Sequence, residues 1–134
     1  MDVKLGEAKH NNRIQDHVHL SVQAAEKFLN QQQANPKLIQ QVLACVHEHH
    51  QTSWSSKEAE ICANADCYRF LDLNNWLSFI HEQGRKQQPY TETLALAIQK
   101  FEEKRAILSL QICKEELKEH QRIIQELIDK MKTL

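Results

Sequence analysis

Apolar residues recur at helical spacing over most of the chain. The first run starts after Asp16, and its apolar positions lie three or four residues apart: Val18, Val22, Ala25, Phe28 and Leu29. This spacing predicts a helix with one buried face that ends at the polar run 31–33. Asn35-Pro36 then predicts the start of a second helix, with Asn as N-cap and Pro at the first helical position. Its apolar stripe continues to His47-Glu48-His49-His50.

A third helix is predicted from Ser55 to about Leu73. The segment Ser55-Ser56-Lys57-Glu58 has the spacing of a capping box, which would start this helix. Asp66 falls in the middle of the predicted buried stripe. An ionised carboxylate is costly to bury unless it is paired or bound to a metal, so this position requires a partner.

The second half of the chain is predicted to hold a short helix, a loop and a long helical region. The short helix lies between residues 74 and 88, and the loop covers 84–89. After Thr91 more than forty residues without Gly or Pro have helical spacing, and the apolar stripe changes phase between Ile112 and Leu117. Either the helix breaks there, or a shared helix leaves the domain and pairs with another chain, for example in a homodimer.

Composition supports an all-α fold in a single domain, residues 1–134. Only two glycines and two prolines occur in 134 residues, too few for strands joined by tight turns. The net charge of -1 provides no broad cationic field for nucleic acid or an anionic membrane surface, and neither partner is expected. The longest purely apolar runs are far shorter than the roughly 20 residues that cross a bilayer.

Two further observations concern the cellular compartment. The first residues lack the basic and apolar regions of a signal peptide, so we expect a cytoplasmic protein. The four cysteines form no CxxC pair, and we interpret them as reduced core thiols.

Histidine is the residue that points to chemistry, because six of the eight histidines lie between His10 and His50. The first two predicted helices are joined by a short link and are expected to be antiparallel neighbours, which would bring His17 near His49. Together with Asp66 these side chains would form a mixed nitrogen and oxygen site suited to Mn, Fe, Ni, Co or Zn.

A structural interpretation of the same residues stays open. Histidines near a helix C-terminus gain from the helix dipole when protonated, without any metal. Asp66 could instead accept a hydrogen bond from an amide or form a salt bridge with Arg69. The three histidines outside these helix ends are interpreted as exposed bystanders: His10, His81 and His120.

Several short segments, in their order, resemble the second half of an HD-domain metal-dependent phosphohydrolase. In that superfamily a helix beginning with His precedes a helix ending in a His-His segment, and an Ala-Asp helix supplies the last aspartate ligand. The resemblance covers roughly residues 14–72, and the helices of 90–134 resemble those that close such domains. The matching segments are Asp16-His17, Ala24-Ala25, Phe28-Leu29, Ile39 to Val42, Val46-His47-Glu48-His49-His50, Ser56 to Glu60-Ile61 and Ala63-Asn64-Ala65-Asp66.

The resemblance implies an orthogonal helical bundle with a long C-terminal helix or helix pair, and hydrolysis of a phosphomonoester or nucleotide by a metal-activated water. It implies metal ligands among His17, His49, His50 and Asp66, and we add Lys57 and Arg69 as candidate phosphate contacts. No residue is assigned a catalytic role. The His-Asp pair that names the family has no counterpart here, since Asp16-His17 has the reverse order and few residues precede it. We therefore also expect, as the alternative, a truncated or inactive HD-like module that acts through protein–protein contacts.

Overall fold

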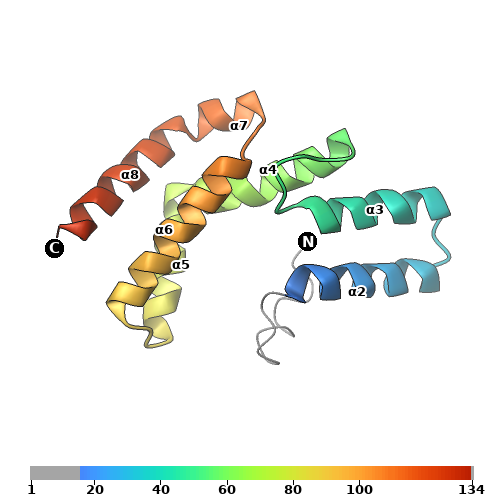
Figure 1. Ribbon diagram of the computed structural model, residues 1–134, viewed down its shortest axis with the longest axis horizontal. Helices are drawn as coiled ribbons and strands as arrows, with labels where there is room; N and C mark the ends of the chain where they lie inside the picture. The colour runs from blue at the N-terminus through green and yellow to red at the C-terminus, as the bar shows by residue number, and fades with distance from the viewer. Residues whose placement is uncertain (1–15, 134) are drawn as a thin grey trace. The chain divides into compact units, whose positions relative to one another are not determined.

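The computed structural model describes residues 16–133, and these residues form seven α-helices and no strand. The predicted all-α fold is confirmed. Figure 1 shows the helices in chain order: α2 (His17–Gln31), α3 (Pro36–Glu48), α4 (Lys57–Leu71), α5 (Leu73–Arg85), α6 (Tyr90–Ile107), α7 (Gln111–Glu116) and α8 (Lys118–Lys132). The described chain divides into two compact units, with the boundary between Ala63 and Asn64 inside α4.

The first unit is built on the antiparallel pair α2 and α3, which lie side by side in Figure 1. The short link between them reverses the chain at Gln33, whose φ of 54° is in the left-handed region. The predicted cap of α3 is confirmed, because the Asn35 side chain accepts a hydrogen bond of 2.8 Å from the Lys37 backbone N–H. Antiparallel packing places the start of α2 beside the end of α3.

The cap of α4 differs by one residue from the predicted capping box. The Ser56 hydroxyl, not that of Ser55, accepts a hydrogen bond of 3.1 Å from the Ala59 backbone N–H. Ser55 instead donates its own backbone N–H to Glu48 Oε2 at 2.8 Å, and so it holds the connection that follows α3. The helix consequently begins at Lys57.

In the second unit α5 packs against both α6 and α8. The Trp76 indole N–H donates to the Ala97 carbonyl at 3.4 Å, and the rings of Phe70 and Phe79 are 5.2 Å apart. The largest side chains here that are less than 2% exposed are apolar: Leu71, Trp76, Phe101, Leu117, Ile124 and Ile128.

The C-terminal helical region is broken rather than continuous. The main break lies at residues 108–110, which the pattern did not predict, and a second break lies at Leu117, at the end of the interval where the apolar stripe changes phase. Asn64 stabilises the first break: its Oδ1 accepts from the backbone N–H groups of Ser109 and Leu110, each at 2.9 Å, and its Nδ2 donates to the Ser109 hydroxyl at 2.8 Å. The buried Ile124 and Ile128 of the second stripe cover part of this unit's own core.

No helix in residues 16–133 has the length and apolar character needed to cross a bilayer. The orthogonal HD-type arrangement and the single domain stay predictions.

Candidate metal centre

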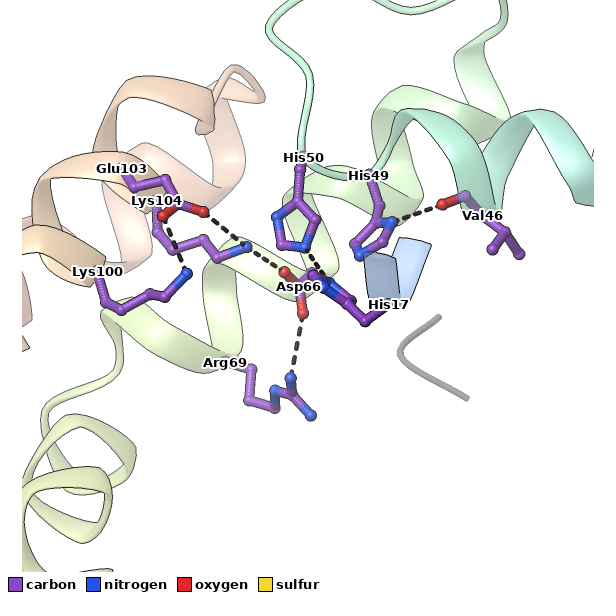
Figure 2. Close-up of polar contacts among 9 residues, drawn as sticks. All are labelled: His17, Val46, His49, His50, Asp66, Arg69, Lys100, Glu103 and Lys104. Carbon is purple, nitrogen blue, oxygen red and sulfur yellow. Dashed lines mark hydrogen bonds and ion pairs between the residues drawn. The ribbon is translucent and has the colours of Figure 1, made fainter. Parts of the chain in front are cut away.

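Three imidazole rings converge where the start of α2 meets the end of α3. His17 is the first residue of α2, and His49 and His50 directly follow the last residue of α3. One ring nitrogen from each lies within 4.8 Å of the other two, and Figure 2 shows the three rings side by side. The predicted approach of His17 to His49 is confirmed, and His50 joins them. Among the described residues this is the one group of metal-binding side chains with such spacing.

His49 is held in one orientation by the helix that it follows. Its ring is buried, and Nδ1 lies 2.7 Å from the Val46 carbonyl oxygen, one of the carbonyls that the last turn of α3 leaves without an intrahelical partner. A carbonyl only accepts, so Nδ1 must carry the proton. In the neutral ring Nε2 then bears the lone pair. A backbone carbonyl bonded to one ring nitrogen commonly fixes the other nitrogen as a metal ligand.

His17 and His50 face each other through their Nε2 atoms, which are 3.2 Å apart. Two nitrogens each about 2.05 Å from a tetrahedral zinc ion would be separated by about 3.3 Å, nearly the observed distance. The same distance also fits an N–H···N hydrogen bond, in which one ring carries its proton on Nε2. The three side chains therefore fit a metal ion. Without an ion, His17 and His50 form a hydrogen-bonded pair.

The remaining histidines of these two helices lie outside the cluster. His19, two residues after His17, is exposed and bonds the Gln23 side-chain amide at 3.0 Å. His47 is also exposed, two residues before the buried His49. Residues two apart point to nearly opposite faces of a helix, so only one residue of each such pair can reach the cluster.

Asp66 is buried, as predicted, and belongs to the second unit. Its Oδ2 lies 2.5 Å from the ammonium of Lys104, and its Oδ1 accepts from Arg69 at 3.2 Å (Figure 2). The salt bridge with Arg69 that the sequence left open is thus present. Sequence reasoning missed Lys104, although it occupies an apolar position of its helix, three residues after Phe101 and four before Leu108. A fourth ligand from Asp66 stays a prediction.

The candidate phosphate contacts have carboxylate partners. Lys57 is paired with Glu60 at 2.8 Å, and Arg69 with Asp66. Both side chains are about two-thirds exposed, which also leaves them accessible to a ligand.

All four cysteines are free thiols, as predicted, but only Cys67 is a buried core residue, and the other three are half-buried. Burial, together with a hydrogen bond to the Cys62 thiol, raises the pKa of Cys45 to about 11. Burial raises the pKa of Cys67 to about 12. No thiol belongs to the group of converging ligand atoms, so the candidate centre is a site of imidazole nitrogens.

Comparison with models of known protein families, with curated protein sequences and with solved structures gave no match.

Proposed function

We propose that the chain binds a divalent transition metal ion through His17, His49 and His50 and hydrolyses a phosphomonoester or nucleotide. The observation that carries the metal site is the convergence of the three ring nitrogens within 4.8 Å of one another. The class of reaction rests on the resemblance to HD-domain phosphohydrolases.

The donor set limits which ions fit. Three imidazoles favour Zn, Fe, Co or Ni, and Mn if oxygen ligands complete the shell. Three protein ligands are also the usual number where a metal keeps a position open for water or substrate. When bound, such an ion would polarise a phosphoryl oxygen and lower the pKa of a coordinated water.

Other contacts of the chain would orient the ligands, complete the metal coordination and bind the phosphate. The bond from His49 to the Val46 carbonyl fixes the ring before an ion arrives, which lowers the cost of ordering the site. Asp66 would be the further ligand that the resemblance implies, and Lys57 and Arg69 would contact the phosphate of the substrate.

Metal analysis tests the site. The full chain is expressed with Mn, Fe, Co, Ni or Zn in the medium and purified, and its metal content is measured together with the thermal midpoint. We expect about one equivalent of one of these metals, a higher midpoint when it is bound, and a fall below about 0.2 equivalents in His49→Ala and His50→Ala. His19→Ala and His47→Ala are matched controls on the same two helices and should keep the metal.

Two outcomes would overturn the metal site. One is wild-type protein with less than about 0.2 equivalents of every metal and no thermal stabilisation by any of them. The other is loss of metal that is equal in His49→Ala and His47→Ala. The metal content of Asp66→Asn, whose fold is checked by circular dichroism, tests separately whether Asp66 is the fourth ligand.

Phosphate release tests the reaction. The metal-loaded chain is incubated with p-nitrophenyl phosphate and with a panel of nucleoside monophosphates, and inorganic phosphate is measured. Release that disappears in His49→Ala supports hydrolysis. A chain that holds metal but releases no phosphate from any of them would favour the alternative, an inactive HD-like module.

A further inference from the structure

A second candidate binding site lies in the second unit, on residues that the metal centre does not use. A groove with a volume of about 530 Å³ is formed where the end of α6 meets α7 and α8. This volume is within the range of about 300–1,000 Å³ that is typical of small-molecule sites. Its lining is mainly cationic and amide-bearing: Arg105, Leu108, Lys114, Lys118, Gln121, Arg122, Gln125 and Glu126.

The cations of the groove come from two separate parts of the fold. Arg105 lies in the last turn of α6, with its guanidinium 5.8 Å from the centre of the Phe101 ring and one N–H directed at Gln125 Oε1 at 3.3 Å. Lys114 and Lys118 lie on α7 and α8, four residues apart. The break at residues 108–110 turns the chain so that both parts line one groove.

Two of these charges have no acidic partner among residues 16–133. Arg122 is paired with both Glu119 and Glu126. In residues 16–133, by contrast, neither Lys114 nor Lys118 makes an ion pair, and both are exposed. Two unpaired ammonium groups with Arg105 on the same groove repel one another, and a bound anion would relieve that repulsion.

The other residues that line the groove favour a compact ligand. The half-buried amides of Gln121 and Gln125 offer donors and acceptors, and the buried Leu108 adds an apolar surface. Exposed acidic residues flank the lysines on the same helices, at Glu115 and Glu116. The one carboxylate of the lining, Glu126, is paired with Arg122, and the flanking carboxylates would repel a long polyanion that extends beyond the groove more than a small ligand held within it.

We propose that this groove binds a small molecule that carries a polyphosphate group and is the size of a nucleotide. Lys114, Lys118 and Arg105 hold the phosphates, and the glutamine amides contact the rest of the ligand. The guanidinium of Arg105 presents the planar pair of donors that matches a phosphate group. The proposal does not depend on the metal centre.

Calorimetric titration of the full chain tests the groove. The protein is freed of metal with EDTA and titrated with inorganic tripolyphosphate, ATP and adenosine in turn. We expect tripolyphosphate and ATP to bind, ATP more tightly, adenosine not to bind, and the affinity for ATP to fall as salt is raised. Lys114→Ala/Lys118→Ala should weaken ATP binding about tenfold or more, because each lysine contributes a charge-assisted contact.

The matched control removes the same charge from the same helical region outside the groove. Lys130→Ala/Lys132→Ala alters two exposed lysines in the last turn of α8 and should change ATP affinity by less than about twofold. Equal losses of ATP affinity in the two double variants would mean that ATP is attracted by the overall charge rather than by the groove, and would overturn the proposal. So would absence of ATP binding by the wild type. Tighter binding of a single strand of about ten nucleotides than of ATP would replace the proposed class with nucleic acid.

Discussion

Lys104 of α6 and Asp66 of α4 form a buried ion pair. The ammonium nitrogen lies 2.5 Å from Oδ2, and the two residues are only 2% and 7% exposed. Arg69, whose side chain is 65% exposed, contacts the other carboxylate oxygen. The pair thus provides the partner that the position of Asp66 within an apolar stripe requires, and it links two helices that are remote in the sequence.

Removing the lysine should destabilise the second unit strongly. Lys104→Met leaves the buried carboxylate with Arg69 alone, and we expect the free energy of unfolding to fall by about 3–5 kcal/mol. Asp66→Asn/Lys104→Met should recover part of this loss, because no unpaired charge remains. Guanidinium denaturation followed by circular dichroism measures both.

Lys100 is the matched control for this experiment. It is paired with Glu103 at 3.0 Å on the same helix, with both side chains about one-third exposed. Lys100→Met should cost less than about 1 kcal/mol. A loss for Lys104→Met as small as that for Lys100→Met would show that the pair contributes no more than a surface ion pair.

Asn64 should be the most sensitive polar residue of the connection between α6 and α7. Asn64→Ala leaves the half-buried backbone N–H groups of Ser109 and Leu110 without their acceptor, and each unsatisfied group costs up to about 1–3 kcal/mol. Ser109→Ala removes the hydroxyl that accepts from the Asn64 side-chain amide and leaves both backbone hydrogen bonds to the amide oxygen in place. We expect Asn64→Ala to lower the denaturation midpoint more than Ser109→Ala does. The reverse order would contradict a capping role for the amide oxygen.

The parts of the fold that local chemistry determines were predicted, and those that tertiary contacts determine were not. Asn35-Pro36 marks the start of α3 because both residues act on their own backbone. The cap of α4 is at Ser56 because the backbone N–H of Ser55 donates to the Glu48 carboxylate, seven residues upstream. The break at 108–110 likewise depends on Asn64, which is 45 residues away from Ser109.

The same distinction holds for the candidate sites. The proximity of His17 to His49 could be predicted from the sequence, because a short link between two amphipathic helices requires antiparallel packing. Lys104 could not be assigned to Asp66, since no spacing relates residues 38 positions apart. The groove around Arg105 was missed for a similar reason: its shape depends on where the C-terminal helices break.

The thiol of Cys67 should make stability fall in alkaline solution. Its side chain is fully buried, and burial is the main cause that raises its pKa from 9.0 to about 12, while the ammonium of Lys104 opposes the shift. Between these two values the unfolded chain ionises and the folded chain stays protonated, so the folded state binds more protons. The contribution of this thiol to the free energy of unfolding is therefore complete below about pH 9. It is lost as pH rises toward 12, by at most about 1.4 kcal/mol per pH unit. Urea denaturation at a series of pH values, wild type against Cys67→Ala, measures this difference. The variant should show a shallower decline above pH 9, and parallel curves would mean that the buried thiol ionises as readily in the folded chain as in the unfolded one.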